Sequence, residues 1–133
     1  MEPMICLDSD FLIDFLNDKK EAVEFLIKYH GDFVTTEINL FEVFDGIYYQ
    51  KQVNKKEEEL AKSFFKTLPT LSSQNGWGQA AAYLLSYLRK QGKEIEDKDC
   101  FIAAIMQVHG CSKIITRNVK HYSSIPGIQV ISY

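Results

Sequence analysis

The stretch from Met4 to Leu16 constrains the fold more than any other part of the sequence. A short apolar run, Met4 to Leu7, ends at Asp8 and is followed by apolar residues at helical spacing, namely Phe11, Leu12, Phe15 and Leu16. The run is too short for a helix, so the pattern predicts a buried strand, a tight turn and an amphipathic helix. We therefore expect Asp8 at the carboxyl end of a buried strand, where open parallel α/β sheets bind their ligands. A helix cap at Ser9 or Asp10 would equally explain the acidic turn.

The rest of the chain alternates between strand-like and helix-like segments. Further strands are predicted at residues 33–36, 112–116 and 128–131, with a short extended segment at 68–71. Helices are predicted at residues 21–29, 38–48, 51–67, 77–91 and 100–108, with a short one within 117–122. This alternation predicts an α/β fold of three layers, α/β/α, around a mostly parallel sheet. A length of 133 residues fits a single domain over residues 1–133.

Composition restricts the class of protein. Hydrophobic residues make up 46% and charged residues 25%, which are globular values, and the net charge of −3 gives no global reason to bind nucleic acid. Such a partner would need a local basic patch. The three cysteines lack CxxC spacing, so neither a zinc site nor a disulfide framework is indicated. No apolar run reaches the roughly 20 residues of a membrane span, so we expect a cytoplasmic protein without a membrane partner.

Acidic and amide side chains follow several of the predicted elements. Glu42 lies in the helix after the second strand, Asp97 and Asp99 begin the apolar helix 100–108, and Asn118 follows a late strand. Each is explained singly by a cap or a solvated side chain, although only one of the two aspartates can cap the helix.

Convergence of these side chains at one edge of the sheet would have a chemical consequence. Crowded carboxylates repel one another unless a cation lies among them, and this repulsion should raise at least one pKa when no metal is bound. Oxygen ligands without histidine or cysteine suit Mg²⁺ or Mn²⁺, and such an ion activates water against a phosphodiester. The sequence therefore predicts a metal-dependent phosphodiesterase.

Four segments in order carry a resemblance to a known family: residues 7–14, 36–46, 92–104 and 114–128. They resemble the motifs of the PIN domain, and within it the VapC-type toxin ribonucleases of toxin–antitoxin pairs. The resemblance implies endonucleolytic cleavage of RNA with Mg²⁺ or Mn²⁺. It also implies a homodimer and a VapB-type antitoxin partner.

Carried over by motif, the catalytic and metal-binding acids are Asp8, Glu42 and Asp99, with Asp97 as an auxiliary ligand. The fourth ligand position holds Asn118 where the fullest form of the family has aspartate. Asparagine offers a carbonyl oxygen without charge, which leaves open whether one or two metals bind. Asp10 is a candidate for compensating charge.

RNA must also be held. Arg117, Lys120 and His121 follow the strand that presents Asn118, so they are candidate substrate-binding residues, although a solvated loop explains them equally well. A second basic group comprises Arg89, Lys90 and Lys93.

Aromatic residues on two of the predicted helices are candidates for a partner surface or for the core. They are Phe41, Phe44, Tyr48, Tyr49, Phe64 and Phe65.

Two other classes of protein compete with the nuclease. The first is an interaction domain that kept the fold and lost the chemistry, which the asparagine at position 118 favours. The second is a receiver-like phosphorylation module, which also gathers acids at strand ends. That module would need a lysine after a late strand, and this chain has Arg117 there.

Overall fold

The computed structural model describes residues 3–74 and 76–133. Their strands form a five-stranded parallel sheet in the order β3-β2-β1-β4-β5. The strands are β1 (Met4–Leu7), β2 (Asp32–Thr36), β3 (Thr70–Leu71), β4 (Lys113–Ile115) and β5 (Gln129–Ile131). The helices are α1 (Ser9–Leu16), α2 (Lys20–Lys28), α3 (Glu37–Tyr49), α4 (Lys55–Thr67), α5 (Trp77–Lys90), α6 (Asp97–Val108) and α7 (Val119–Ser123). The predicted α/β class and parallel sheet are confirmed.

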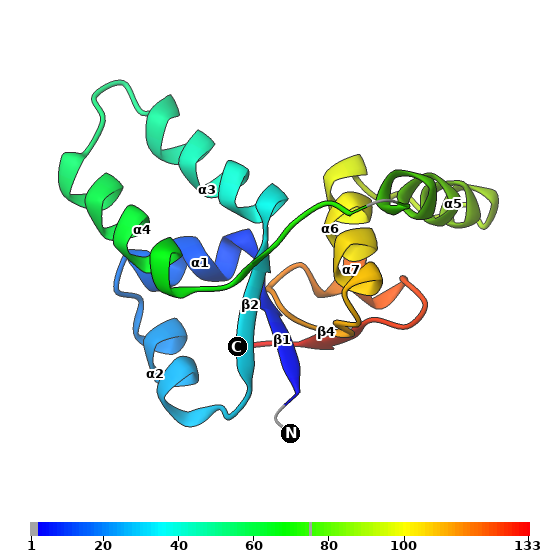
Figure 1. The fold of residues 1–133 in the computed structure, drawn as a ribbon, viewed down its shortest axis with the longest axis horizontal. Helices are drawn as coiled ribbons and strands as arrows, with labels where there is room; N and C mark the ends of the chain where they lie inside the picture. Colours follow the sequence, from blue (N-terminus) through cyan, green and yellow to red (C-terminus); the bar gives the residue numbers. More distant parts are fainter. Residues whose placement is uncertain (1–2, 75) are drawn as a thin grey trace.

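Side chains of β1 alternate between two apolar cores, one on each face of the sheet. Ile5 and Leu7 pack with helices α1 to α4, whereas Cys6 packs with helices α5 to α7. Figure 1 shows the two groups of helices on opposite sides of the strands. The layers are therefore α/β/α, as predicted.

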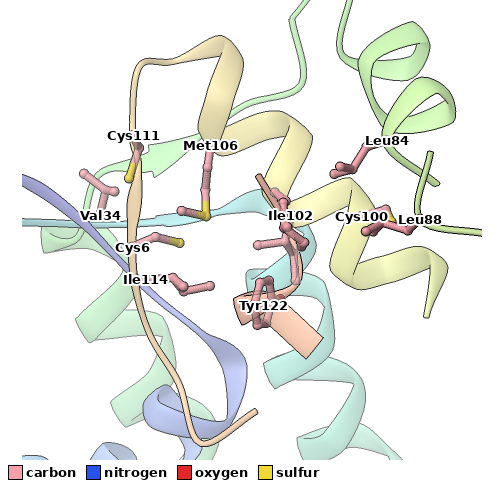
Figure 2. Close-up of a cluster of buried hydrophobic side chains, with 12 residues drawn as sticks. Cys6, Val34, Leu84, Leu88, Cys100, Ile102, Met106, Cys111, Ile114 and Tyr122 are labelled. Atoms are coloured by element: carbon pink, nitrogen blue, oxygen red, sulfur yellow. The ribbon is translucent and has the colours of Figure 1, made fainter. Parts of the chain in front are cut away.

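The core on the α6 side packs against the central strands of the sheet. Figure 2 shows Cys6 and Ile114 of the central strands facing Ile102 and Met106 of α6. Tyr122 of α7 is fully buried in the same cluster. Because α6 is apolar on most sides, it packs tightly against the sheet and α5, and this packing sets the position of its first turn.

The structure corrects the predicted start of one helix. Helix α4 begins at Lys55 rather than at residue 51, because the side chain of Asn54 accepts a hydrogen bond from the backbone N–H of Glu57 and caps the helix there. The segment 68–71 contains the short edge strand β3, as the sequence analysis allowed.

The six candidate aromatic residues divide into two groups. Phe41, Tyr48 and Tyr49 are exposed. The others are partly buried against the core of the α1 to α4 layer: Phe44, Phe64 and Phe65.

Hydropathy of the helices bears on a membrane location. In the described part of the chain, no helix combines the length and apolar character needed to cross a bilayer.

Candidate active site

The site forms where the neighbouring strands β1 and β4 end. Leu7 pairs with Ile115, so the next residues along the two strands, Asp8 and Thr116, lie side by side. The Thr116 hydroxyl donates a hydrogen bond of 2.7 Å to Asp8 Oδ2. The parallel sheet thus places a hydroxyl donor directly against the first candidate acid.

Asp8 is held by donors on both carboxylate oxygens. Its Oδ1 accepts hydrogen bonds of 2.9 Å from the backbone N–H of Ser9 and from Asn39 Nδ2. Burial raises the pKa of Asp8 to about 7, with smaller contributions from the charges of Asp10 and Asp99, while the bonds from Thr116 and Ser9 act in the opposite direction. The prediction of a raised pKa is confirmed, but its main cause is burial rather than repulsion.

Helix α3 brings Glu42 to the same place. The helix begins with a capping box in which Thr36 and Asn39 bond to each other's backbone N–H groups. Glu42 follows Asn39 by three residues, so it lies on the same side of α3. Its Oε1 accepts a hydrogen bond of 2.7 Å from Ser9 Oγ. Burial raises the pKa of Glu42, and Ser9 and the charge of Lys98 partly offset that rise.

Helix α6 supplies Asp99 from its first turn. Asp99 is 9% exposed; its Oδ1 accepts a hydrogen bond of 3.2 Å from the Tyr122 hydroxyl, and its Oδ2 lies 3.0 Å from His121 Nδ1. Glu96 occupies the cap position, and both Asp97 and Asp99 lie within the helix. Helix capping, the alternative explanation for these two aspartates, therefore applies to neither.

Asp97 is directed away from the other acids. Its Oδ1 lies 3.5 Å from Arg89 Nη2 on α5, and its side chain is 61% exposed. Residues 97 and 99 are two positions apart in the first turn of α6, so they lie on different sides of the helix and only Asp99 faces the strand ends. The structure thus places Asp97 in an ion pair with Arg89, outside the hydrogen-bond network of Asp8, Glu42 and Asp99.

Asn118 contacts Asp99 through nitrogen. Its Nδ2 donates a hydrogen bond of 3.4 Å to Asp99 Oδ2 and lies 3.0 Å from His121 Nδ1. Its backbone N–H donates to Thr116 Oγ1 at 2.9 Å. In this arrangement Asn118 links Asp99 to Thr116.

The basic candidates divide between two places. The Arg117 guanidinium lies 2.8 Å from Asp14 Oδ2 and over the ring of Tyr133, so its charge is already paired. Lys120 and His121 instead line a surface hollow together with Lys93. Of the three predicted substrate-binding residues, Lys120 and His121 therefore share one surface next to Asp99.

Asp10 supports the loop after β4. Its carboxylate accepts hydrogen bonds from the backbone N–H groups of Phe11, at 2.7 Å, and Arg117, at 2.9 Å. Burial raises the pKa of Asp10. These bonds hold the turns after β1 and β4 together, which places Thr116 against Asp8.

Sequence reasoning missed four polar residues of this site: Ser9 as a donor to Glu42, Asn39, Thr116 and Tyr122. The spacing of Thr36 and Asn39 is that of a capping box, so it was a readable signal for Asn39. Nothing local marks Thr116 or Tyr122, because their roles depend on strand order and on the packing of α7.

The three acids of the site offer oxygen ligands of the kind that a divalent metal ion binds. Within residues 3–74 and 76–133, no three acidic, histidine or cysteine side chains form a ready-made metal site. The donor types nonetheless fit a hard divalent cation, since Asp8, Glu42 and Asp99 offer only oxygen. The raised pKa values of Asp8 and Glu42 show that charge on them is unfavourable without a counter-ion.

The fold and site together define a class: α/β proteins that gather acids at the carboxyl edge of a parallel sheet. A family model for the PIN domain matches residues 5–124, so the chain belongs to the PIN-domain family. The enzymes of this family are nucleases that use divalent metals.

Solved structures agree with this fold. VapBC2 from Rickettsia felis, bound to a promoter DNA fragment, is 18% identical with a TM-score of 0.83, covering 98% of each chain. DNA-bound VapBC from Salmonella typhimurium is 19% identical with a TM-score of 0.82, covering 99% of this chain and 98% of that one. Mycobacterium tuberculosis VapC20, described as a sarcin-ricin loop cleaving toxin, is 14% identical with a TM-score of 0.69, covering 94% and 98%. Comparison with curated protein sequences gives no match.

Proposed function

We propose that the chain is a single PIN domain, residues 1–133, acting in the cytoplasm as a metal-dependent endoribonuclease of the VapC toxin type. The observation that carries the proposal is Asp8, a buried acid held by three donors at the end of β1, with Glu42 and Asp99 bound into the same network of side chains. Membership of the PIN-domain family supports it, as does the likeness to VapC20, which is described as a sarcin-ricin loop cleaving toxin.

In this proposal Asp8, Glu42 and Asp99 hold Mg²⁺ or Mn²⁺. When bound, the ion lowers the pKa of a coordinated water and offsets negative charge on the phosphodiester. Thr116 and Asn39 keep the Asp8 carboxylate in place, and Tyr122 and Asn118 do the same for Asp99. We propose that Asp97 pairs with Arg89 and that Asn118 orients Asp99.

Substrate binding is assigned to the side of the site formed by α7. Lys120 and His121 line the hollow beside Asp99, where they would contact phosphates of the RNA flanking the cleaved bond. Arg117 binds RNA phosphates there only if its ion pair with Asp14 breaks, or if it uses guanidinium N–H groups that do not contact Asp14. We therefore rank Lys120 and His121 ahead of Arg117.

The structural neighbours also suggest which proteins bind this chain. Several structural neighbours are toxin–antitoxin complexes, including VapBC-1 of nontypeable Haemophilus influenzae, 20% identical, and FitAcB of Neisseria gonorrhoeae, 21% identical. We propose a homodimer and a VapB-type antitoxin partner for this chain. Exposed Tyr48 and Tyr49 at the end of α3 support a protein contact on that helix.

A non-catalytic PIN-fold interaction domain is the second candidate. Two observations favour it: the asparagine at position 118, and the lack of a ready-made metal site within the two described ranges. The two candidates differ in whether the chain cleaves RNA at all.

The deciding experiment is cleavage of single-stranded RNA over a Mn²⁺ and Mg²⁺ titration. The purified chain should cleave with metal and stop in EDTA. Asp99→Asn removes one ligand charge and should slow cleavage by about 100-fold or more, since metal-based charge stabilisation is worth several kcal/mol. The exposed acid Asp45 of α3 provides the matched control Asp45→Asn, which should retain activity. Cleavage that persists in EDTA would contradict the metal mechanism, and no cleavage at any metal concentration would favour the interaction domain.

A further inference from the structure

An exposed aromatic ring lies at the rim of the acid cluster. Phe41 immediately precedes Glu42 in α3, and its side chain is 54% exposed. Its neighbour one turn on, Phe44, is instead partly buried against the core. Core packing therefore explains Phe44 but leaves the exposure of Phe41 unexplained.

A lysine from a different helix lies over one face of this ring. Lys98 Nζ lies 5.3 Å from the centre of the Phe41 ring, a cation–π contact between α6 and α3. Lys98 immediately precedes Asp99. Burial raises the pKa of Glu42, and the charge of Lys98 is near enough to offset part of that rise. The ring and the ammonium thus form a pair beside two of the proposed metal ligands.

The pair combines the two features that proteins use to hold single-stranded nucleic acid. An aromatic face stacks on a base of any identity, and a neighbouring cation binds the phosphate backbone. A base held here would belong to a nucleotide near the acids, because Lys98 lies over the Phe41 ring and its charge also acts on Glu42. A base inside a duplex is stacked on its neighbours and is not available to such a ring.

We propose that Phe41 and Lys98 form a nucleotide subsite, in which Phe41 stacks an unpaired RNA base next to the cleaved phosphate and Lys98 contacts that nucleotide's phosphate. The inference rests on the proposed ribonuclease function and makes its substrate single-stranded RNA. The subsite lies on the α3 side of the acids, whereas Lys120 and His121 lie on the α7 side. RNA would then contact the protein on both sides of the acid cluster.

Binding in EDTA isolates the subsite from catalysis. The probe is a short unstructured oligoribonucleotide carrying 2-aminopurine, whose fluorescence falls when the base stacks. Phe41→Ala should weaken binding by about 5- to 150-fold and abolish the quenching, whereas Phe41→Trp should restore both. Lys98→Gln should weaken binding and reduce its salt dependence. The control Tyr83→Ala removes a ring on α5 that is 75% exposed and should bind as wild type does.

The outcomes separate the subsite from the proposed function. If the wild-type chain cleaves RNA and Phe41→Ala binds and cleaves equally well, the subsite is refuted while the ribonuclease stands. If the wild-type chain never cleaves, the proposed function fails, and quenching that depends on Phe41 still supports the subsite. If Phe41→Ala leaves RNA affinity unchanged but alters the sedimentation of the protein, Phe41 is a protein contact and the inference is overturned. Equal weakening toward duplex RNA would also overturn it.

Discussion

Replacing Asp8 with asparagine should remove the contribution of Asp8 to the pH dependence of stability in the metal-free protein. The replacement keeps the local bonding possible. The oxygen of the new amide can accept from the Ser9 N–H and Asn39 Nδ2, as Asp8 Oδ1 does. The Thr116 hydroxyl can turn from Asp8 toward Asp10, whose oxygens lie 3.3 and 3.4 Å away, and accept from the new amide nitrogen. The main change is therefore the loss of a titrating group.

The magnitude follows from the pKa of Asp8. In the unfolded chain the aspartate loses its proton near pH 3.8, whereas in the folded protein its pKa is about 7. Between these values the folded state binds more protons, so the free energy of unfolding falls as pH rises, and the loss is complete above pH 7. From pH 5 to pH 8 this single group should remove about 2.5 kcal/mol from the wild-type protein.

Urea unfolding in EDTA at pH 5 and pH 8 measures this difference. The only tryptophan, Trp77, packs edge-on against Phe101 at the start of α5 and provides the fluorescence signal. Asp8→Asn should lose about 2.5 kcal/mol less than wild type over this pH range. Asp45→Asn, at an exposed position, should behave as wild type does.

The same change with pH in the two proteins would contradict a raised pKa of Asp8. A gain in stability of the wild-type protein between pH 5 and pH 8, relative to Asp8→Asn, would contradict it as well, because Asp8 would then be ionised more readily in the folded state. Saturating Mn²⁺ should reverse the loss in wild type only, since a cation compensates the buried charge.

Two further substitutions test the supporting residues. Thr116→Val removes the hydroxyl that donates to Asp8 and leaves a buried carboxylate oxygen without that donor. The free energy of unfolding at pH 8, measured by the same urea titration, should fall by about 1–3 kcal/mol. An unchanged stability would mean that the hydrogen bond contributes nothing. His121→Ala should slow metal-dependent RNA cleavage by about tenfold or less, because a metal-activated water needs no histidine base; loss as complete as that of Asp99→Asn would assign the imidazole a direct role in proton transfer.

The elements and the identity of the candidate acids could be predicted from local patterns. A four-residue apolar run followed by helical spacing identified β1 and α1, and Asp8 between them, because the periodicity of a strand or helix is expressed within about ten residues. The approach of Glu42 and Asp99 to the same sheet edge followed from the alternation of strands and helices, since parallel strands end on one side. The exposed ring of Phe41 was a candidate, but its exposure was not predictable.

Tertiary structure decided which side chains face one another. Thr116 meets Asp8 across 108 positions of sequence, and this contact exists only because β4 pairs with β1 in one register. The packing of the elements also pairs Arg117 with Asp14 and Asp97 with Arg89. A charged side chain has several rotamers of similar energy, so its ion-pair partner depends on which groups the neighbouring elements place within reach. The local sequence does not show which elements those are.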